Sequence, residues 1–332
     1  LDGAGFARQF LADPEWITKL TEGREDDIRP CILCHNGCFN MCHYKGVPND
    51  QDLSDSLHLA RCAVNAEMMQ WNKHYIKEAK TPKTVHIVGG GIGGMEAARV
   101  LRLRGHNPVI HEKSGELGGA FIAASAESYK GKLRDLLAWY RRQMDKLGID
   151  VRLNDEIKDI SVFGSAPVII ATGATPRYLR SVPGHDKMIE ACDFLLGKEV
   201  GETVAVIGGG NSALQEAVLL SEKCKKVTLV QNLPYFTGEK RLLDVLRERK
   251  NVEYITGSTV RRFEGEGKLS SVVIADESGS ETALSVDGVF VAIGLIPSND
   301  IFSSVCGLDD RGYFDSGEDC KTKTSGIFVA GD

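Results

Sequence analysis

The chain has 332 residues, 42% of them hydrophobic, so it is long enough for more than one domain with a full core. A formal net charge of -6 and a pI of about 5.8 argue against nucleic acid or an anionic membrane as a partner. No apolar run reaches the roughly 18–20 residues of a membrane span, and no secretory signal is visible, so we expect a cytoplasmic protein. Leu1 is not an initiator methionine, which suggests a piece of a longer polypeptide.

The first part of the chain predicts short helices around a cysteine-rich loop. Residues 1–20 predict a loop and then a short helix over Asp13–Leu20, and the charged stretch 23–30 predicts a linker. A second helix is expected over Asn65–Lys80, because Pro82 would end it.

Five of the nine cysteines lie in one short stretch, namely Cys31, Cys34, Cys38, Cys42 and Cys62. Such clustering favours metal or cluster ligation over a disulfide scaffold. The close spacing of the first three suits both an iron–sulfur cluster and structural zinc. Spacing alone therefore leaves the metal open, and we favour Cys62 over Cys42 as the fourth ligand.

A dinucleotide-binding signature follows at Thr84–Gly94, TVHIVGGGIGG. An apolar strand runs into Gly89, Gly91 and Gly94 at G-x-G-x-x-G spacing, and a helix is expected over Met95–Leu103. In such a unit the glycines allow a tight turn, close approach of a pyrophosphate and close helix packing.

The next segments extend this first unit. A second strand, Pro108–His111, delivers Glu112 about 20 residues after the glycines, where a carboxylate can bind ribose hydroxyls. Gly118 and Gly119 can run beside a flavin, an amphipathic helix is expected over Lys132–Leu147, and the strand VIIATG ends in a turn of small residues, Ala171, Thr172 and Gly173.

The same pattern returns 119 residues later at Thr203–Ala213, TVAVIGGGNSA. Gly208 and Gly210 occupy the first two glycine positions, and Ala213 takes the third, where alanine is permitted. A helix over Leu214–Ser221 and a strand over Lys226–Val230 complete the second unit. Two such units imply two nucleotides, a bound flavin dinucleotide and a nicotinamide dinucleotide that exchanges hydride with it.

The residues after the second strand of this unit indicate which nicotinamide nucleotide binds. The strand ends at Gln231-Asn232-Leu233, with no acid and no arginine to pair a 2′-phosphate, and the next basic residues are Lys240 and Arg241. We therefore expect NADH rather than NADPH.

The rest of the chain predicts strands that close the second unit and return to the first. These are expected over Val252–Glu264, Ser270–Asp276, Ser285–Phe290, Val291–Gly294 and Gly326–Asp332. The last would place Gly331 and Asp332 at a turn, where the carboxylate could accept from ribityl hydroxyls.

From Thr84 to Asp332 the chain resembles the two-dinucleotide flavoprotein reductases, thioredoxin reductase included. The resemblance implies FAD on the first unit and NAD(P)H on a second unit inserted into the FAD domain. Thioredoxin reductases carry a redox Cys-x-x-Cys before the second unit, whereas this chain has only Cys192 there, which disfavours disulfide reduction.

The front of the chain narrows the resemblance. FARQFLADPEW, GREDDIRPCILCHNGC and RCAVNAE are similar to the family of 2,4-dienoyl-CoA reductase, 2-enoate reductase and trimethylamine dehydrogenase. This implies an FMN-binding TIM barrel related to old yellow enzyme, then a [4Fe–4S] loop, then the FAD and NAD(P)H domains. The chain departs from the family in its long Cys38–Cys62 gap, in Ala66 for proline and in Ala120 for glutamine.

The resemblance implies an α/β architecture of two Rossmann-like domains preceded by the tail of a TIM barrel and a [4Fe–4S] loop. Expected segments are 1–25 (barrel end), 26–80 (iron–sulfur loop and linker helix), 81–200 (FAD), 201–300 (NADH) and 301–332 (return to FAD). Expected cluster ligands are Cys31, Cys34, Cys38 and Cys62. Expected cofactor-binding residues are Ala7, Arg8 (FMN phosphate), Gly89, Gly91, Gly94, Glu112, Lys113, Gly118, Gly119, Ala171, Thr172, Gly173, Gly208, Gly210, Asn211, Ser212, Gly294, Gly331 and Asp332.

The implied function is electron transfer from NADH through FAD, the cluster and FMN to an α,β-unsaturated acid, thioester or ketone. The alternatives are oxidation of a C–N bond by the same architecture and a module for electron transfer alone. A homo-oligomer is compatible with the sequence. The proton donor is expected in the barrel, so the sequence names no catalytic residue.

Overall fold

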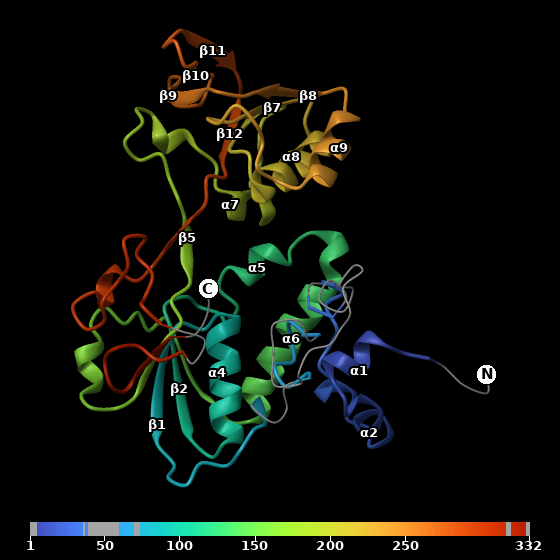
Figure 1. Ribbon diagram of the computed structural model, residues 1–332, viewed down its shortest axis with the longest axis vertical. Helices are drawn as coiled ribbons and strands as arrows, with labels where there is room; N and C mark the ends of the chain where they lie inside the picture. The colour runs from blue at the N-terminus through green and yellow to red at the C-terminus, as the bar shows by residue number, and fades with distance from the viewer. Residues whose placement is uncertain (1–4, 36, 39–59, 70–73, 317–319, 330–332) are drawn as a thin grey trace, which may run out of the picture. The chain divides into compact units, whose positions relative to one another are not determined.

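The computed structural model describes residues 5–35, 37–38, 60–69, 74–316 and 320–329, which form two compact units. Unit 1 comprises residues 1–173 and 298–332, and unit 2 comprises residues 174–297 (Figure 1). Unit 2 is thus inserted into unit 1. Its first residue, Ala174, lies upstream of the boundary at 201 expected from the sequence, because Ile189 and Phe194 pack in the core of unit 2.

Unit 1 is built on a parallel five-stranded sheet of order β14-β4-β1-β2-β3. The strands are β1 (Thr84–Val88), β2 (Asn107–Glu112), β3 (Asp150–Leu153), β4 (Val168–Ile170) and β14 (Ile327–Val329). Parallel strands are covered on both faces, which explains why β1, β2 and β4 read as nearly continuous apolar runs.

Two long helices, α4 (Ile92–Leu103) and α6 (Gly131–Lys146), cover one face of this sheet (Figure 1). Val85 and Ile87 of β1 share a core there with Met95 and with the apolar side of α6. The opposite face is covered by apolar side chains of η3 (Ile160–Phe163) and of 302–314. The smaller helices are α1 (Arg8–Ala12), α2 (Trp16–Thr21), η1 (Glu25–Asp27), α5 (Phe121–Ala124), η2 (Ser128–Lys130) and η5 (Asp300–Phe302).

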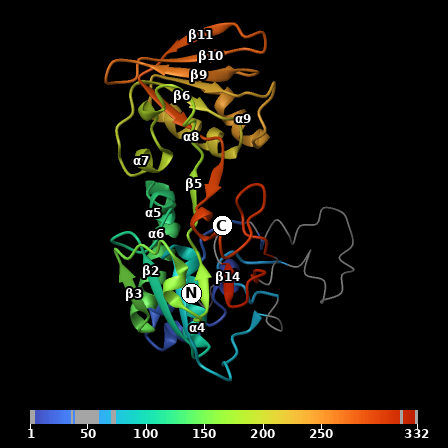
Figure 2. The same ribbon diagram turned by 90° about the vertical axis from the view of Figure 1, so that its left-hand side faces the viewer.

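Unit 2 has a parallel four-stranded sheet of order β12-β6-β7-β8 and an antiparallel sheet of order β11-β10-β9 (Figure 2). The strands are β6 (Thr203–Ile207), β7 (Lys226–Val230), β8 (Val252–Ile255), β9 (Thr259–Glu264), β10 (Ser271–Ala275), β11 (Glu281–Ser285) and β12 (Gly288–Val291). Its helices are α7 (Ala191–Leu195), α8 (Asn211–Lys223), α9 (Lys240–Arg247) and η4 (His185–Lys187), and β5 (Ala174–Pro176) pairs with β13 (Leu295–Pro297). One core lies between the parallel sheet and α8 and α9, and another lies between the two sheets.

Several sequence expectations require correction. The helix expected over Asn65–Lys80 is too long, because the described residues 65–69 and 75–80 are turns and irregular backbone and, of the residues described in this range, His74 alone is helical. The Asn65 side chain accepts from the Glu67 N–H at 3.1 Å, which favours a turn over a helix there. The strand expected over Val252–Glu264 is two strands in different sheets, because the chain turns at Gly257 with φ +64°.

The remaining differences are shifts of boundaries. The helix expected over Asp13–Leu20 corresponds to α2, which begins three residues later, and α1 was not predicted. No strand occurs in the described residues 5–25. The strand expected over Val291–Gly294 is not a separate element, because of these residues only Val291 belongs to a strand, as the last residue of β12. Among the described residues, no helix has the length and apolar character needed to cross a bilayer.

Candidate functional site

The first glycine turn joins β1 to α4, and steric constraints explain each of its glycines. A Cβ on Gly89, whose φ is +112°, would lie 2.2 Å from the carbonyl oxygen of Ala171. A Cβ on Gly94 would lie 2.0 Å from the carbonyl oxygen of Gly89. Gly91, the N-cap of α4, has no atom within 4 Å of its Cβ position and no side-chain cap. The first N–H groups of α4 thus lack a side-chain cap, which leaves them available to a pyrophosphate.

Glu112 ends β2 beside this turn, as predicted. Its buried carboxylate accepts from the Gly90 N–H at 2.6 Å and from the Ser114 N–H at 2.8 Å. A carboxylate has about four acceptor positions, so two remain for ribose hydroxyls. Lys113, the next residue, is exposed.

Two other short segments border the first turn. Gly118 donates to the Gly90 carbonyl at 2.9 Å, and a Cβ on Gly119 would lie 3.4 Å from Gly91 Cα. The Ala171 N–H donates to the Val88 carbonyl at 2.8 Å, and Gly173, with φ +68°, follows at the exit from unit 1. Thr172 lies between them, with its hydroxyl 3.4 Å from the Asn299 amide oxygen. Gly331 and Asp332 lie outside the described residues.

The second glycine turn, between β6 and α8, has the same backbone geometry. Gly208 has φ +134°, and a Cβ there would lie 2.3 Å from the carbonyl oxygen of Ala292. Gly210 is the N-cap of α8 without a side-chain cap. Ala213, fully buried, occupies the third position.

The second turn opens into a pocket of about 560 Å³, a volume typical of cofactor sites. The pocket is lined by Gly208–Ser212 at the turn, by Gln231 and Asn232 after β7, and by Gly294 after β12. Asn211 also exchanges hydrogen bonds with Glu239, at 2.7 Å and 3.2 Å. The pocket thus brings together all the residues predicted for the nicotinamide nucleotide.

Sequence reasoning did not identify two further residues of this pocket, Arg177 and Ser258. The Arg177 N–H donates to the Gly294 carbonyl at 2.9 Å, which places this residue beside the end of β12. No local motif marks these two residues, because the fold brings them together. Thr237, at a position where the resemblance to thioredoxin reductases implies a phosphate-reading arginine, also lines the pocket, and its N–H donates to the Gly209 carbonyl at 2.9 Å.

The four predicted cluster ligands line one pocket in unit 1. Cys31, Cys34, Cys38 and Cys62 surround it together with Arg8, His35 and Arg61. All four thiols are free, and burial raises the pKa of Cys62. Among the described residues, no three His, Cys, Asp or Glu side chains are arranged to hold a single metal ion. Cys42 lies outside the described residues.

Two residues of the cysteine loop have left-handed backbone. Leu33 and His35, on either side of Cys34, have φ +58° and +54°. Left-handed residues of this kind occur in the backbone nests that bind phosphates and Fe–S clusters. The Arg8 guanidinium contacts the His35 ring, so Arg8, predicted for FMN phosphate, also lines this pocket.

Comparisons with known proteins agree with this geometry. Residues 162–332 match the family model of the pyridine nucleotide-disulphide oxidoreductases. The chain belongs to this family. A thioredoxin reductase of Mycolicibacterium smegmatis is 30% identical over 76% of the chain and 89% of its own length. As a member of this family, the chain is an oxidoreductase with Rossmann-like FAD and NAD domains.

Two relatives extend the similarity across the cysteine loop. The cinnamate reductase of Clostridium sporogenes is 33% identical over 92% of this chain and 45% of its own length. A solved 2-naphthoyl-CoA reductase has a TM-score of 0.73 and 28% identity over 90% of this chain and 44% of its own. The resemblance to the 2-enoate reductase family is thereby confirmed. The chain spans less than half the length of these two relatives.

Proposed function

We propose that this chain is the NADH-oxidising part of an ene reductase that contains FAD, a [4Fe–4S] cluster and FMN. When bound, these groups would take a hydride from NADH, carry its electrons singly and deliver them as a pair to an activated C=C bond. The order NADH, FAD, cluster, FMN and substrate is part of the proposal. The proposed substrate is an α,β-unsaturated acid, thioester or ketone, and the names of the two longer relatives support the acid and the thioester.

The observation that carries the proposal is the combination of two glycine turns with a pocket lined by four free thiols. The N–H groups of α4 and α8 would bind the pyrophosphates of FAD and NADH, and Glu112 would bind the FAD ribose. Gln231 and Asn232, which are neutral, support NADH over NADPH.

The cysteine pocket supports a cubane rather than zinc. Structural zinc binds four sulfurs at about 2.3 Å and therefore needs them around one point. In a cubane each thiolate binds its own iron, so the sulfurs need to surround a cavity. The four thiols surround one pocket, which fits a cubane, and the similarity to the 2-enoate reductase family favours a cubane over zinc.

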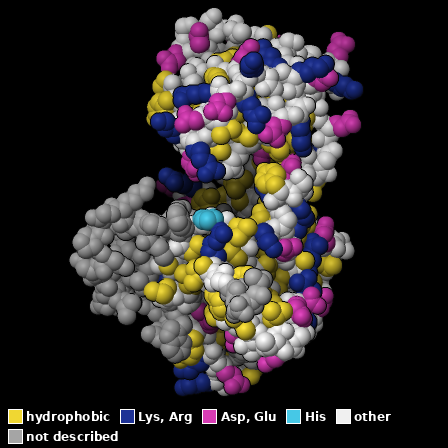
Figure 3. Space-filling view, turned by 90° about the vertical axis from the view of Figure 1, so that its right-hand side faces the viewer, with side chains coloured by type: hydrophobic (Ala, Val, Ile, Leu, Met, Phe, Trp, Pro, Cys, Tyr) yellow, Lys and Arg dark blue, Asp and Glu magenta, His cyan; other side chains and the backbone are white. Residues whose placement is uncertain are grey.

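A surface of unit 1 supports an FMN-binding barrel next to the N-terminal helices. Phe6, Phe10, Ile17 and Leu20, in or just before these helices, have exposed side chains. Figure 3 shows hydrophobic side chains gathered on one face of the molecule. A barrel would cover these four side chains, and Ala7 and Arg8 would reach the FMN phosphate. We place the proton donor in the barrel as well.

The test is Cys34→Ser in the complete enzyme. The variant should keep NADH-dependent bleaching of FAD, because that step uses only the two glycine turns, and should lose enoate reduction. Unchanged enoate turnover would contradict the proposal. Absence of FAD bleaching by NADH in the wild type would favour the amine-oxidising alternative.

A further inference from the structure

The Cys62 segment has to be fixed next to the other three cysteines by contacts that are distant in sequence. Of the residues between Cys38 and Cys62, 39–59 lie outside the described residues. The sequence places 23 residues between the two cysteines, and closing a loop of that length costs conformational entropy. Contacts with other parts of unit 1 are therefore needed to hold the Cys62 segment in place.

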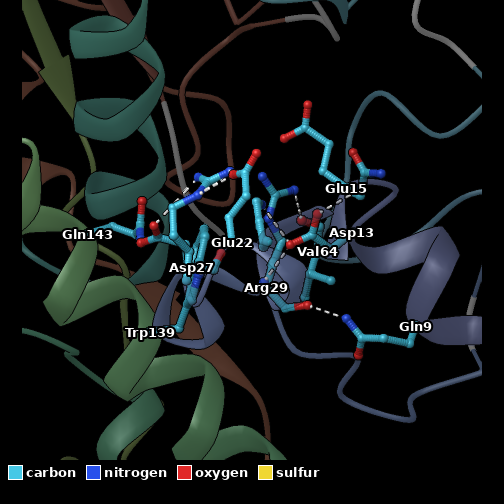
Figure 4. Close-up of polar contacts among 12 residues, drawn as sticks. Gln9, Asp13, Glu15, Glu22, Asp27, Arg29, Val64, Trp139 and Gln143 are labelled. Carbon is cyan, nitrogen blue, oxygen red and sulfur yellow. Dashed lines mark hydrogen bonds and ion pairs between the residues drawn. The ribbon is translucent and has the colours of Figure 1, made fainter. Parts of the chain in front are cut away.

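Arg29 makes such a contact (Figure 4). Its Nη1 donates to the carbonyl oxygen of Val64, two residues after Cys62, at 2.5 Å. The backbone on either side is held as well, because the Gln9 amide donates to the Arg29 carbonyl at 2.8 Å and accepts from the Cys31 N–H at 3.1 Å. One residue therefore links the first and the last cysteine segments.

The same residue rests on helix α6. The Arg29 guanidinium lies over the Trp139 ring, 5.2 Å from its centroid, and the indole N–H donates to the Asp27 carbonyl at 3.0 Å. Lys146 of α6 also pairs with Asp27 at 2.6 Å. The segment that precedes the cysteines is thus fastened to the helix that covers the sheet of unit 1.

The Arg29 guanidinium has no ion pair among the described residues. The two acids closest to it have other partners, because Glu96 binds the guanidinium of Arg99 through both carboxylate oxygens and Asp13 pairs with Lys19 at 2.8 Å. The Nε of Arg29 is buried and has no hydrogen-bond partner among the described residues. A buried guanidinium without an ion pair of its own is costly unless an anion lies close by.

We propose that Arg29 is a positioning residue for the [4Fe–4S] cluster, an inference that rests on the proposed function. Its guanidinium holds the Cys62 segment in place through Val64, and its charge offsets the negative charge that four thiolates bring. Buried cations favour the more reduced, more negative state of a nearby redox centre. Arg29 therefore also raises the reduction potential of the cluster.

The test compares Arg29→Met and Arg29→Lys with Arg99→Met in the anaerobically purified holoenzyme. Arg99 also lies over Trp139, at 5.7 Å, but makes no hydrogen bond to a cysteine segment in the described structure, so it controls for the loss of the ring contact. Arg29→Met should bind at least twofold less iron per FAD, Arg99→Met should match the wild type, and Arg29→Lys should recover part of the loss. FAD per chain reports folding of unit 1.

The residual cluster of Arg29→Met should be harder to reduce by about tenfold in the equilibrium constant, which is about 59 mV for one electron. Arg29→Lys, which keeps the charge, should stay near the wild-type potential. Iron per FAD equal to the wild type in Arg29→Met would overturn the positioning role, and an unchanged potential would overturn the role of the charge. If Arg29→Met loses FAD, Arg29→Lys decides by the same iron criterion. A wild type without iron would overturn the proposed function itself.

Discussion

The two glycine turns of the chain share one backbone and differ in the side chains around it. Gly89 and Gly208 both have positive φ, and a Cβ on either would lie within 2.3 Å of a carbonyl oxygen on a neighbouring strand end. The third position differs, being Gly94 in unit 1 and the buried Ala213 in unit 2. The turn itself is therefore fixed by sterics, while the helix behind it tolerates a methyl group in one unit only.

The residue at the C-terminal end of the second strand of each unit differs as well. Glu112 presents a carboxylate over its turn, whereas Gln231, 119 residues later, presents an amide that lies against Gly209. The opposite faces of the sheets also differ, since His86 and His111 of unit 1 correspond to the apolar Ala205 and Val230 of unit 2. Shared geometry thus indicates a nucleotide, and the surrounding side chains indicate which one.

The largest effect is expected from the matched pair Gly89→Ala and Gly208→Ala. Each methyl group would collide with a carbonyl oxygen and force a positive φ on alanine, a cost of about 2–5 kcal/mol. Gly89→Ala should lose FAD, and Gly208→Ala should keep FAD but lose NADH binding measured by calorimetry. Each variant is the control for the other. Loss of FAD in Gly208→Ala would show that the two sites do not act separately.

Exchanging glycine and alanine at the third position of the two glycine turns should have a smaller effect on stability. Gly94→Ala should lower stability by about 1–3 kcal/mol, because its Cβ would lie 2.0 Å from the Gly89 carbonyl oxygen. Ala213→Gly should cost only about 1 kcal/mol, the usual penalty for glycine within a helix. Thermal unfolding of both variants measures the difference. Equal shifts would mean that the closer packing of the first helix has no energetic consequence.

Local pattern was enough to predict both turns and the strands around them. Glycine spacing and apolar runs identify β1, β2, β6 and β7 to within a residue. The helix after the first turn begins at Ile92 rather than at Met95, because the glycine turn itself forms its first residues. Contacts between distant segments could not be predicted, as for Arg177 in the nucleotide pocket and for Trp139, which bonds to Asp27 across 112 residues.

Glu112 and Gln231, the residues at the C-terminal end of the second strand of each unit, can be exchanged between the units. Glu112→Gln should weaken FAD binding by about 1 kcal/mol, roughly fivefold, because the charge-assisted hydrogen bonds from Gly90 and Ser114 become neutral ones. Gln231→Glu should lower kcat/KM for NADPH more than for NADH, since a carboxylate repels a 2′-phosphate by about 1 kcal/mol. Equal changes for both nucleotides would contradict the placement of the adenosine ribose beside Gln231.

The smallest effect is expected from the histidines on the face of the unit 1 sheet opposite α4 and α6. His86 Nδ1 lies 2.9 Å from His111 Nε2, and His111 Nδ1 lies 2.7 Å from an Asp155 oxygen. Burial lowers the pKa of His86, and the nearby His111 and Arg152 lower it further, while Asp150 opposes them. Below a pH of about 6.5 the unfolded chain binds a proton that the folded chain binds less readily.

The contribution of His86 to stability is therefore complete above that pH and is lost as the pH falls toward its lowered pKa in the folded protein. His86→Ala, which copies Ala205 of unit 2, should reduce the drop in melting temperature between pH 7.5 and pH 5.5 by a few degrees at most. His185→Ala, on an exposed turn of unit 2, is the control and should leave the drop unchanged. An equal drop in wild type and His86→Ala would mean that protonation of this face does not oppose folding.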